Sequence, residues 1–157
     1  MASRSTWKNP SLLCVAALVL VAAEPKPVEP AILELRGRIV CLAEEVSRQH
    51  GVALPTNHAH LLGFKTTNST CYTLLRVKTS EALFADKRLQ EKELLLTGRV
   101  FPKTQVLEVT RMKSIVNGVV NDLFYFCDIC TIVTISPEIC LCCQGPVELI
   151  ERPLKAK

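Results

Sequence analysis

Glycine is scarce in this sequence, proline is no more than ordinarily frequent, and no residue type dominates it. Among 157 residues there are 6 glycines and 9 prolines, while 48% of the residues are hydrophobic and 22% are charged. This composition excludes a collagen-like chain, a coiled coil and a chain that is disordered throughout. The 8 cysteines make up about 5% of the chain, below the density of a disulfide miniprotein. The length allows one ordinary domain that buries its own hydrophobic core.

The motifs of the common catalytic sites are also missing. The chain contains no GxSxG nucleophile motif, no HExxH zinc-protease motif and no phosphate-binding loop. Asp86, Glu108 and Asp128 are isolated acids, and the neighbours Glu44 and Glu45 would point to different sites in either a helix or a strand. Nothing in the sequence requires an enzyme, although one is not excluded, and we expect a non-enzymatic protein.

Residues 1–23 have the pattern of a secretory signal peptide. A polar start carries Arg4 and Lys8 but no acid, and an apolar run over residues 11–23 then ends in small residues. This run is shorter than the roughly 20 residues of a membrane span. We therefore expect an exported protein, periplasmic or secreted, with no membrane span after cleavage. Without cleavage the segment would be an N-terminal membrane anchor. Residues 24–31 are proline-rich and predict an extended leader.

Cleavage would change the charge and the cysteine count. The net charge of +4 would fall to about +2 with the loss of Arg4 and Lys8, which is too weak to favour nucleic acid. We expect the partner to be a protein or a small ligand. Cys14 would also be lost, leaving seven cysteines, an odd number that disulfides alone cannot pair.

The hydrophobic pattern predicts short strands and one short helix. Residues 33–41 alternate strictly between apolar and polar, as a half-buried strand does. The residues around Glu44 to Gln49 indicate a single helical turn. The remaining predicted elements are strands at 59–65 and 71–77 with a hairpin loop between them, a helix capped by Thr79 or Ser80 and reaching Leu89, strands at 93–101 and 104–112, a turn at Asn117-Gly118, and a long strand at 119–126.

This order of three strands, a helix and two strands resembles the OB-fold, a five-stranded Greek-key barrel. Gly37 and Gly98 each stand in mid-strand, where a barrel strand bends sharply. The predicted fold is mainly β: an OB-fold-like barrel over residues 32–114, then a long strand and a cysteine-rich β-hairpin over residues 115–157. The alternative is a plain antiparallel meander or a small sandwich.

Five cysteines gather near the C-terminus. Cys127, Cys130, Cys140 and Cys143 read as CxxC-x9-CxxC, and Cys142 is a fifth thiol that is either an alternative ligand or a spare. Two CxxC turns at opposed ends of a hairpin supply four thiolates to one ion, which suits zinc, with iron also possible. The arrangement resembles a zinc ribbon or a rubredoxin-like knuckle pair, although its spacer is shorter than that of a usual ribbon.

Other uses of these cysteines stay open. Disulfides Cys127–Cys143 and Cys130–Cys140 would staple the same hairpin, because an exported protein meets an oxidising environment. A thiol-redox protein or an envelope metal carrier would use the CxxC…CxCC cluster with Cys142 as a reactive thiol. Haem attachment is excluded, because Thr131 stands where CxxCH requires histidine.

Two weaker patterns involve histidine and the remaining cysteines. His58 and His60, with His50 nearby, are interpreted as solvated loop histidines, with a second metal site as the alternative. Cys41 and Cys71 fall on inward-facing phases of their strands and are interpreted as buried free thiols, with a disulfide between them as the alternative.

Aromatic and arginine residues give two further alternatives. The aromatic run at 124–126 is interpreted as packing between the barrel and the hairpin, and alternatively as a ligand-stacking platform. Five arginines are spread over several strands: Arg36, Arg38, Arg76, Arg99 and Arg111. They could gather on one face of a disulfide-stapled barrel and form a binding site for an anionic ligand. The alternative is that they are solvated side chains with no such role.

As a whole the chain resembles small exported bacterial proteins of unassigned role, a resemblance that implies no activity. We expect an exported, non-enzymatic binding or structural module with a structural zinc ion in its C-terminal hairpin.

Overall fold

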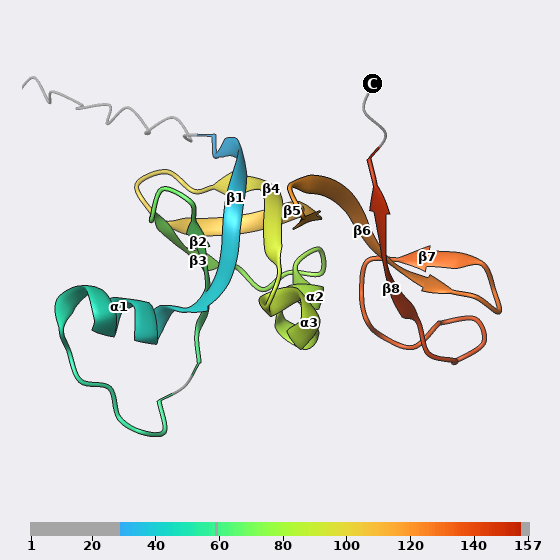
Figure 1. The fold of residues 1–157 in the computed structure, drawn as a ribbon, viewed down its shortest axis with the longest axis horizontal. Helices are drawn as coiled ribbons and strands as arrows, with labels where there is room; N and C mark the ends of the chain where they lie inside the picture. The colour runs from blue at the N-terminus through green and yellow to red at the C-terminus, as the bar shows by residue number, and fades with distance from the viewer. Residues whose placement is uncertain (1–28, 59, 155–157) are drawn as a thin grey trace, which may run out of the picture.

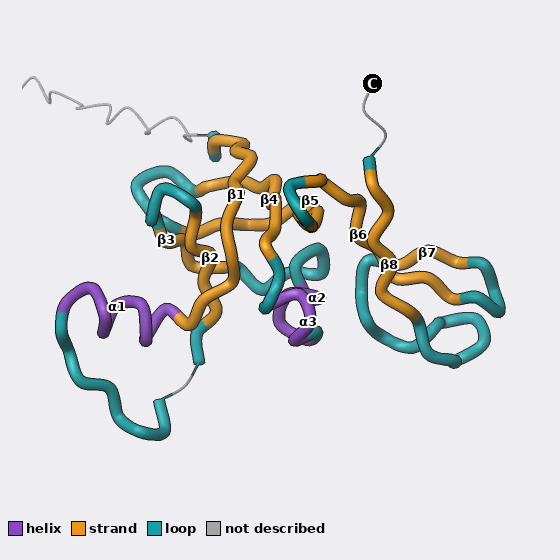
Figure 2. Tube along the Cα trace, viewed as in Figure 1, coloured by secondary structure: helices purple, strands orange, loops and turns teal. Residues whose placement is uncertain are grey.

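The computed structural model describes residues 29–58 and 60–154 (Figures 1 and 2). The predicted signal peptide and residues 24–28 of the leader lie outside the described residues. The described part is mainly β, as predicted, with eight strands in one sheet. In chain order the elements are β1 Ala31–Cys41, α1 Leu42–His50, β2 Leu62–Thr66, β3 Cys71–Leu74, α2 Glu81–Ala85, α3 Lys87–Gln90, β4 Glu93–Val100, β5 Val106–Val116, β6 Val119–Cys127, β7 Ile132–Thr134 and β8 Glu148–Pro153.

Strands β1 to β5 pair in a circuit that returns to its starting strand. β1 pairs with both β2 and β4, β2 pairs with β3, and β4 pairs with β5, all antiparallel. A short parallel pairing between β3 and β5 completes the circuit. The helices α2 and α3 lie between β3 and β4 in the chain, where the sequence predicted a helix.

Gly37 lies where β1 changes partners. It is in register with Thr66 of β2 and with Leu94 of β4, so two strands flank it. A Cβ at this position would lie 2.1 Å from the carbonyl oxygen of Lys65. Only glycine lets the backbones approach this closely. Gly98 also lies in mid-strand, as predicted, at a register shift between β4 and β5.

The hydrophobic core fills the space between these five strands and the helices α2 and α3. Alternate residues of β4 and β5 point into it, as the period of a strand requires. Its fully buried members include one aromatic side chain from β2 and leucines from both helices: Phe64, Leu83, Leu89, Leu94, Leu96, Leu107 and Val109. Tyr125 of β6 joins the same cluster, and with it the strand that leads to the C-terminal cysteines.

The helices differ from the sequence prediction in number and in capping. Three short helices are present in the described residues, where one helix and a single turn were expected. α1 runs to His50 because Gly51 ends it in the left-handed conformation, with φ of 66°. Ser80 is the N-cap residue of α2, one of the two predicted, but its hydroxyl makes no capping hydrogen bond and donates to the carbonyls of Leu75 and Val77 instead. None of the described helices is long and apolar enough to cross a membrane.

The C-terminal strands extend the sheet away from strands β1 to β5, at the right of Figure 1. Asn117 and Gly118 both have positive φ (50° and 79°), as a two-residue type I′ turn requires, and join β5 to β6. Along its length β6 pairs first with β5, then with β8 and β7. β6 is therefore the connection between the core and the cysteine-rich hairpin.

Candidate metal centre

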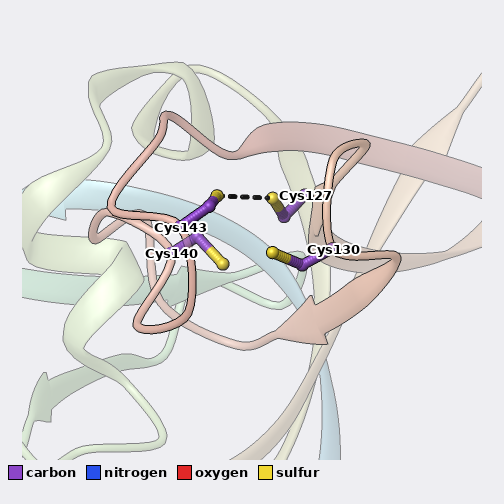
Figure 3. Close-up of side chains that lie close together, drawn as sticks. All are labelled: Cys127, Cys130, Cys140 and Cys143. Carbon is purple, nitrogen blue, oxygen red and sulfur yellow. Dashed lines mark hydrogen bonds between the residues drawn. The ribbon is translucent and has the colours of Figure 1, made fainter.

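Four cysteine side chains from the C-terminal hairpin point toward one another (Figure 3). The Sγ atoms of Cys127, Cys130, Cys140 and Cys143 all lie within 4.8 Å of one another, and those of Cys127 and Cys143 are 3.5 Å apart. Tetrahedral zinc with Zn–S bonds of about 2.3 Å separates its sulfur ligands by about 3.8 Å. The four sulfurs are therefore spaced so that this four-cysteine group could hold a metal ion.

Both CxxC pairs have the same local structure. Cys127 ends β6 and its partner lies in the following turn, while the second pair occupies a turn after residue 139. In each pair the backbone N–H groups two and three residues later donate to Sγ of the first cysteine: Ile129 and Cys130 to Cys127, and Cys142 and Cys143 to Cys140. Such bonds stabilise negative charge on a thiolate, which is the form that binds metals.

A residue with positive φ follows each pair and turns the chain back over the sulfurs. Thr131 has φ of 55° and Gln144 has φ of 56°. Gly145 lets the chain approach the group, because a Cβ there would lie 3.3 Å from the Cys143 Sγ. Its carbonyl accepts a 2.9 Å bond from the N–H of Cys140 and closes the turn.

The thiols also alter one another's ionisation. Backbone N–H groups of Cys143 and Cys142 lower the pKa of Cys140 to about 7. The pKa of Cys130 is raised, first by hydrogen bonds with the thiols of Cys142 and Cys143 and then by burial. The pKa of Cys127 is also raised, because burial and the adjacent thiols outweigh the N–H of Cys130. Ionisation of one thiol therefore disfavours ionisation of its neighbours, because the thiolates repel one another. A bound cation would offset this repulsion.

The seven cysteines in the described residues are all free thiols. The Cys127–Cys143 pair, which the disulfide alternative would join, is separated by 3.5 Å between sulfurs, whereas a disulfide bond is about 2.05 Å long. Cys143, and not Cys142, belongs to the four-cysteine group. Cys142 is exposed, with its thiol beside that of Cys130.

The hairpin that carries these cysteines has almost no hydrophobic core. Between Asp128 and Leu154 the buried residues are Ser136 and Cys140. Large apolar side chains instead stand exposed around the four-cysteine group: Ile129, Ile132, Val133, Ile135, Ile139 and Leu141. We refer to these six residues as the apolar hairpin surface. Several of them line a cavity of about 220 Å³ beside Cys127 and Cys140.

The weaker sequence patterns have mixed outcomes. Cys41 and Cys71 are half-buried rather than buried, and Cys71 is in register with Lys65.

The rings of His58 and His60 lie 4.8 Å apart beside Cys41, while His50 is not in their group. Sequence reasoning missed that Cys41 and Glu44 accompany these histidines. The available signal was a Cys-x-x-Glu at a strand end followed by His-x-His.

The predicted packing role of the aromatic run holds for Tyr125, which is buried in the core. The arginines give no support to an anion-binding face. Three of them form ion pairs with carboxylates on neighbouring elements, in the pairs Arg36–Glu93, Arg76–Glu81 and Arg99–Glu108.

Comparisons with known proteins found no match to any family model, to any curated protein or to any solved structure.

Proposed function

We propose that this protein is an exported, non-enzymatic binding module whose C-terminal hairpin is folded around one structural zinc ion. The four-cysteine group carries the proposal. Four sulfurs within 4.8 Å of one another, supplied by two turns with the same N–H···S pattern, match what a closed tetrahedral zinc site requires. Zinc is the preferred ion, since four thiolates suit it and it needs no redox protection.

The hairpin has almost no buried core, so a bound metal would be needed to stabilise its fold. Apart from Cys140, no apolar side chain between Asp128 and Leu154 is buried. Such a segment buries too little surface to offset the conformational entropy of ordering it. Zinc binding would supply that free energy directly, because the site does not exist in the unfolded chain.

The barrel part of the proposal is an OB-fold-like architecture. It is supported by the pairing circuit of β1 to β5, by the parallel contact between β3 and β5, and by the helices between β3 and β4. Export is proposed from the signal-peptide pattern of residues 1–23 alone.

The binding role is proposed for the apolar hairpin surface, with a protein as the partner. Leu141 is 95% exposed and Ile129 is 70% exposed. Contiguous apolar side chains on a surface mark interaction sites. β7 adds a second reason, because it ends the strand order of the sheet and pairs in the described residues with β6 alone. An extended partner segment could pair with this edge while its side chains contact Ile132 and Val133.

Metal analysis together with hydrogen exchange tests the structural zinc. We expect one zinc ion per chain at the four-cysteine group. A chelator should increase amide exchange from Tyr125 onward and leave the core strands β4 and β5 protected. The proposal fails if the purified protein, with its thiols reduced, takes up no zinc at these cysteines, or if the tail keeps its protection after the metal is removed.

The partner surface is tested by comparing two variants in extracts of the source cell. The double variant Ile139→Ser, Leu141→Ser should retain only a small part of the partner protein that the wild type binds from the extract. Ile32→Ser is the matched control, because Ile32 is 73% exposed but lies on β1. Equal retention by all three proteins would contradict the assignment of this surface.

A metal carrier or thiol-redox protein is the second candidate, and the position of Cys142 favours it. Cys142 is exposed and its thiol lies beside Cys130 of the four-cysteine group. A carrier needs such an extra thiol to pass a soft metal by ligand exchange. Alkylation of the zinc-loaded protein separates the candidates. Rapid modification at Cys142 with release of zinc would favour the carrier, and modification with full zinc retention would favour the structural role.

A further inference from the structure

A second group of metal-ligating side chains lies at the opposite end of the described chain. The Sγ of Cys41, a carboxylate oxygen of Glu44, and one ring nitrogen each of His58 and His60 all lie within 4.8 Å of one another. Three segments supply them: Cys41 ends β1, Glu44 lies in the first turn of α1, and the histidines lie in the connection to β2. We call this set the Cys–Glu–His–His group.

The distances within the group match the edges of a tetrahedral zinc site. The Cys41 Sγ lies 3.7 Å from His58 Nε2 and 3.3 Å from His60 Nδ1. Oε1 of Glu44 lies 3.5 Å and 3.7 Å from the same two nitrogens. Zinc bonds of about 2.0 to 2.3 Å to nitrogen, oxygen and sulfur place neighbouring ligands roughly 3.3 to 3.6 Å apart.

Groups outside the four ligands hold two of them in the orientation that metal binding needs. Nδ1 of His58 lies 3.1 Å from the carbonyl oxygen of Pro55. A proton on Nδ1 donated to that carbonyl leaves the Nε2 lone pair directed at Cys41 and Glu44. The backbone N–H groups of Glu44 and Ala43 donate to the Cys41 sulfur, as the knuckle N–H groups do at the four-cysteine group.

The segment between α1 and β2 lacks any other anchor in the core. From Gly51 to Leu61 every described side chain is exposed or half-buried. A metal joining the end of β1 to His58 and His60 would close this loop and restrict the unfolded chain. The site is reachable from solvent, since the side chains of Glu44 and His60 are 58% and 65% exposed.

We propose that Cys41, Glu44, His58 and His60 bind a second zinc ion, which fixes the loop between α1 and β2. One sulfur, two imidazoles and one carboxylate form a borderline-soft donor set that suits Zn²⁺. With four protein ligands the site is closed, so the ion is structural. This proposal is independent of the four-cysteine group and would stand if that group bound no metal.

Zinc counting on the full chain and on three histidine variants tests the proposal. His60→Ala should bind one zinc fewer than the wild type, because it removes an exposed ligand without touching the core. His50→Ala is the matched control: His50 is also exposed, lies nearby on α1 and is outside the group, so this variant should keep the wild-type zinc content. His60→Cys, which restores a ligand, should recover the missing ion.

Two further readouts make the result decisive. Zinc should slow amide exchange over residues 51–61 in the wild type and in His50→Ala, but not in His60→Ala. With Co²⁺ in place of zinc, Cys41→Ser should remove one thiolate charge-transfer contribution and leave that of the four-cysteine group intact. Equal zinc content in the wild type, His60→Ala and Cys41→Ser would overturn the proposal. The side chains would then form only hydrogen bonds and ion pairs.

Discussion

The phenolic hydroxyl of Tyr125 donates a 2.8 Å hydrogen bond to Oδ2 of Asp86. Tyr125 lies on β6, two residues before the first knuckle cysteine, and Asp86 caps the N-terminus of α3 by accepting from the N–H of Arg88. Both side chains are buried. This one bond therefore connects the strand that leads into the hairpin with the helices that cover the core.

Removing the hydroxyl should weaken the fold without creating a cavity. Tyr125→Phe is expected to lower the free energy of unfolding by about 2 kcal/mol, because a buried bond to a charged acceptor is lost. Urea denaturation measures the change. Tyr72→Phe is the control, since Tyr72 packs only partly against the core and its loss should cost less than about 0.5 kcal/mol. Equal effects of the two changes would contradict a specific role for the bond.

The same carboxylate makes stability depend on pH. Hydrogen bonds from Arg88 first, and then from Tyr125, hold the pKa of Asp86 below its ordinary value of 3.8 despite the opposing effect of burial. A carboxyl whose pKa is lowered by folding contributes stability above its unfolded pKa, and this contribution is lost as the pH falls through the folded pKa.

Asp86→Asn should remove that dependence. At pH 7 the variant is expected to be less stable than the wild type by about 1 to 3 kcal/mol. The difference in stability should shrink as the pH falls below about 4. The wild-type carboxyl is then protonated first in the unfolded chain and, at lower pH, in the folded protein. Urea unfolding of both proteins at a series of pH values measures the gap. A gap that stays constant down to pH 2 would show that Asp86 does not act through its charge.

Serine substitutions test which cysteine is the fourth ligand of the proposed zinc ion. Cys143→Ser should lower the zinc affinity of the hairpin by about 100-fold or more, whereas Cys142→Ser should leave it unchanged. The reason is that Cys143 belongs to the four-cysteine group and Cys142 does not. Competition with a colorimetric chelator gives both affinities. The opposite order would make Cys142 the ligand and Cys143 the spare thiol.

Gly37 should be the least replaceable glycine of strands β1 to β5. Gly37→Ala is expected to lower the free energy of unfolding by about 3 kcal/mol, because the new methyl group meets the backbone of β2. Gly51→Ala has open space around its Cβ and meets only the strain of its positive φ, so about 1 kcal/mol is expected. Thermal unfolding compares the two variants. A smaller loss for Gly37→Ala would mean that β1 and β2 can separate locally.

The strands could be predicted because their pattern is local. The alternation from Leu33 to Cys41 and the Asn117-Gly118 turn each depend on neighbours in the chain, and β1 and the type I′ turn formed where expected. The helices were less predictable. α1 buries the carboxylate of Glu45, which accepts a 2.6 Å bond from Lys65 of β2, and no local pattern contains that contact.

The two candidate metal groups also show which features follow from the local sequence and which follow from the tertiary structure. The sequence alone determined that four cysteines at CxxC spacing could meet, because the members of each pair are only three residues apart. Tertiary structure decided that Cys143 joins the group while Cys142 faces solvent. It also decided that Cys41 and Glu44 accompany His58 and His60. These two segments are separated along the chain by the loop that ends at the histidines, and only the pairing of β1 with β2 brings that loop back to the end of β1.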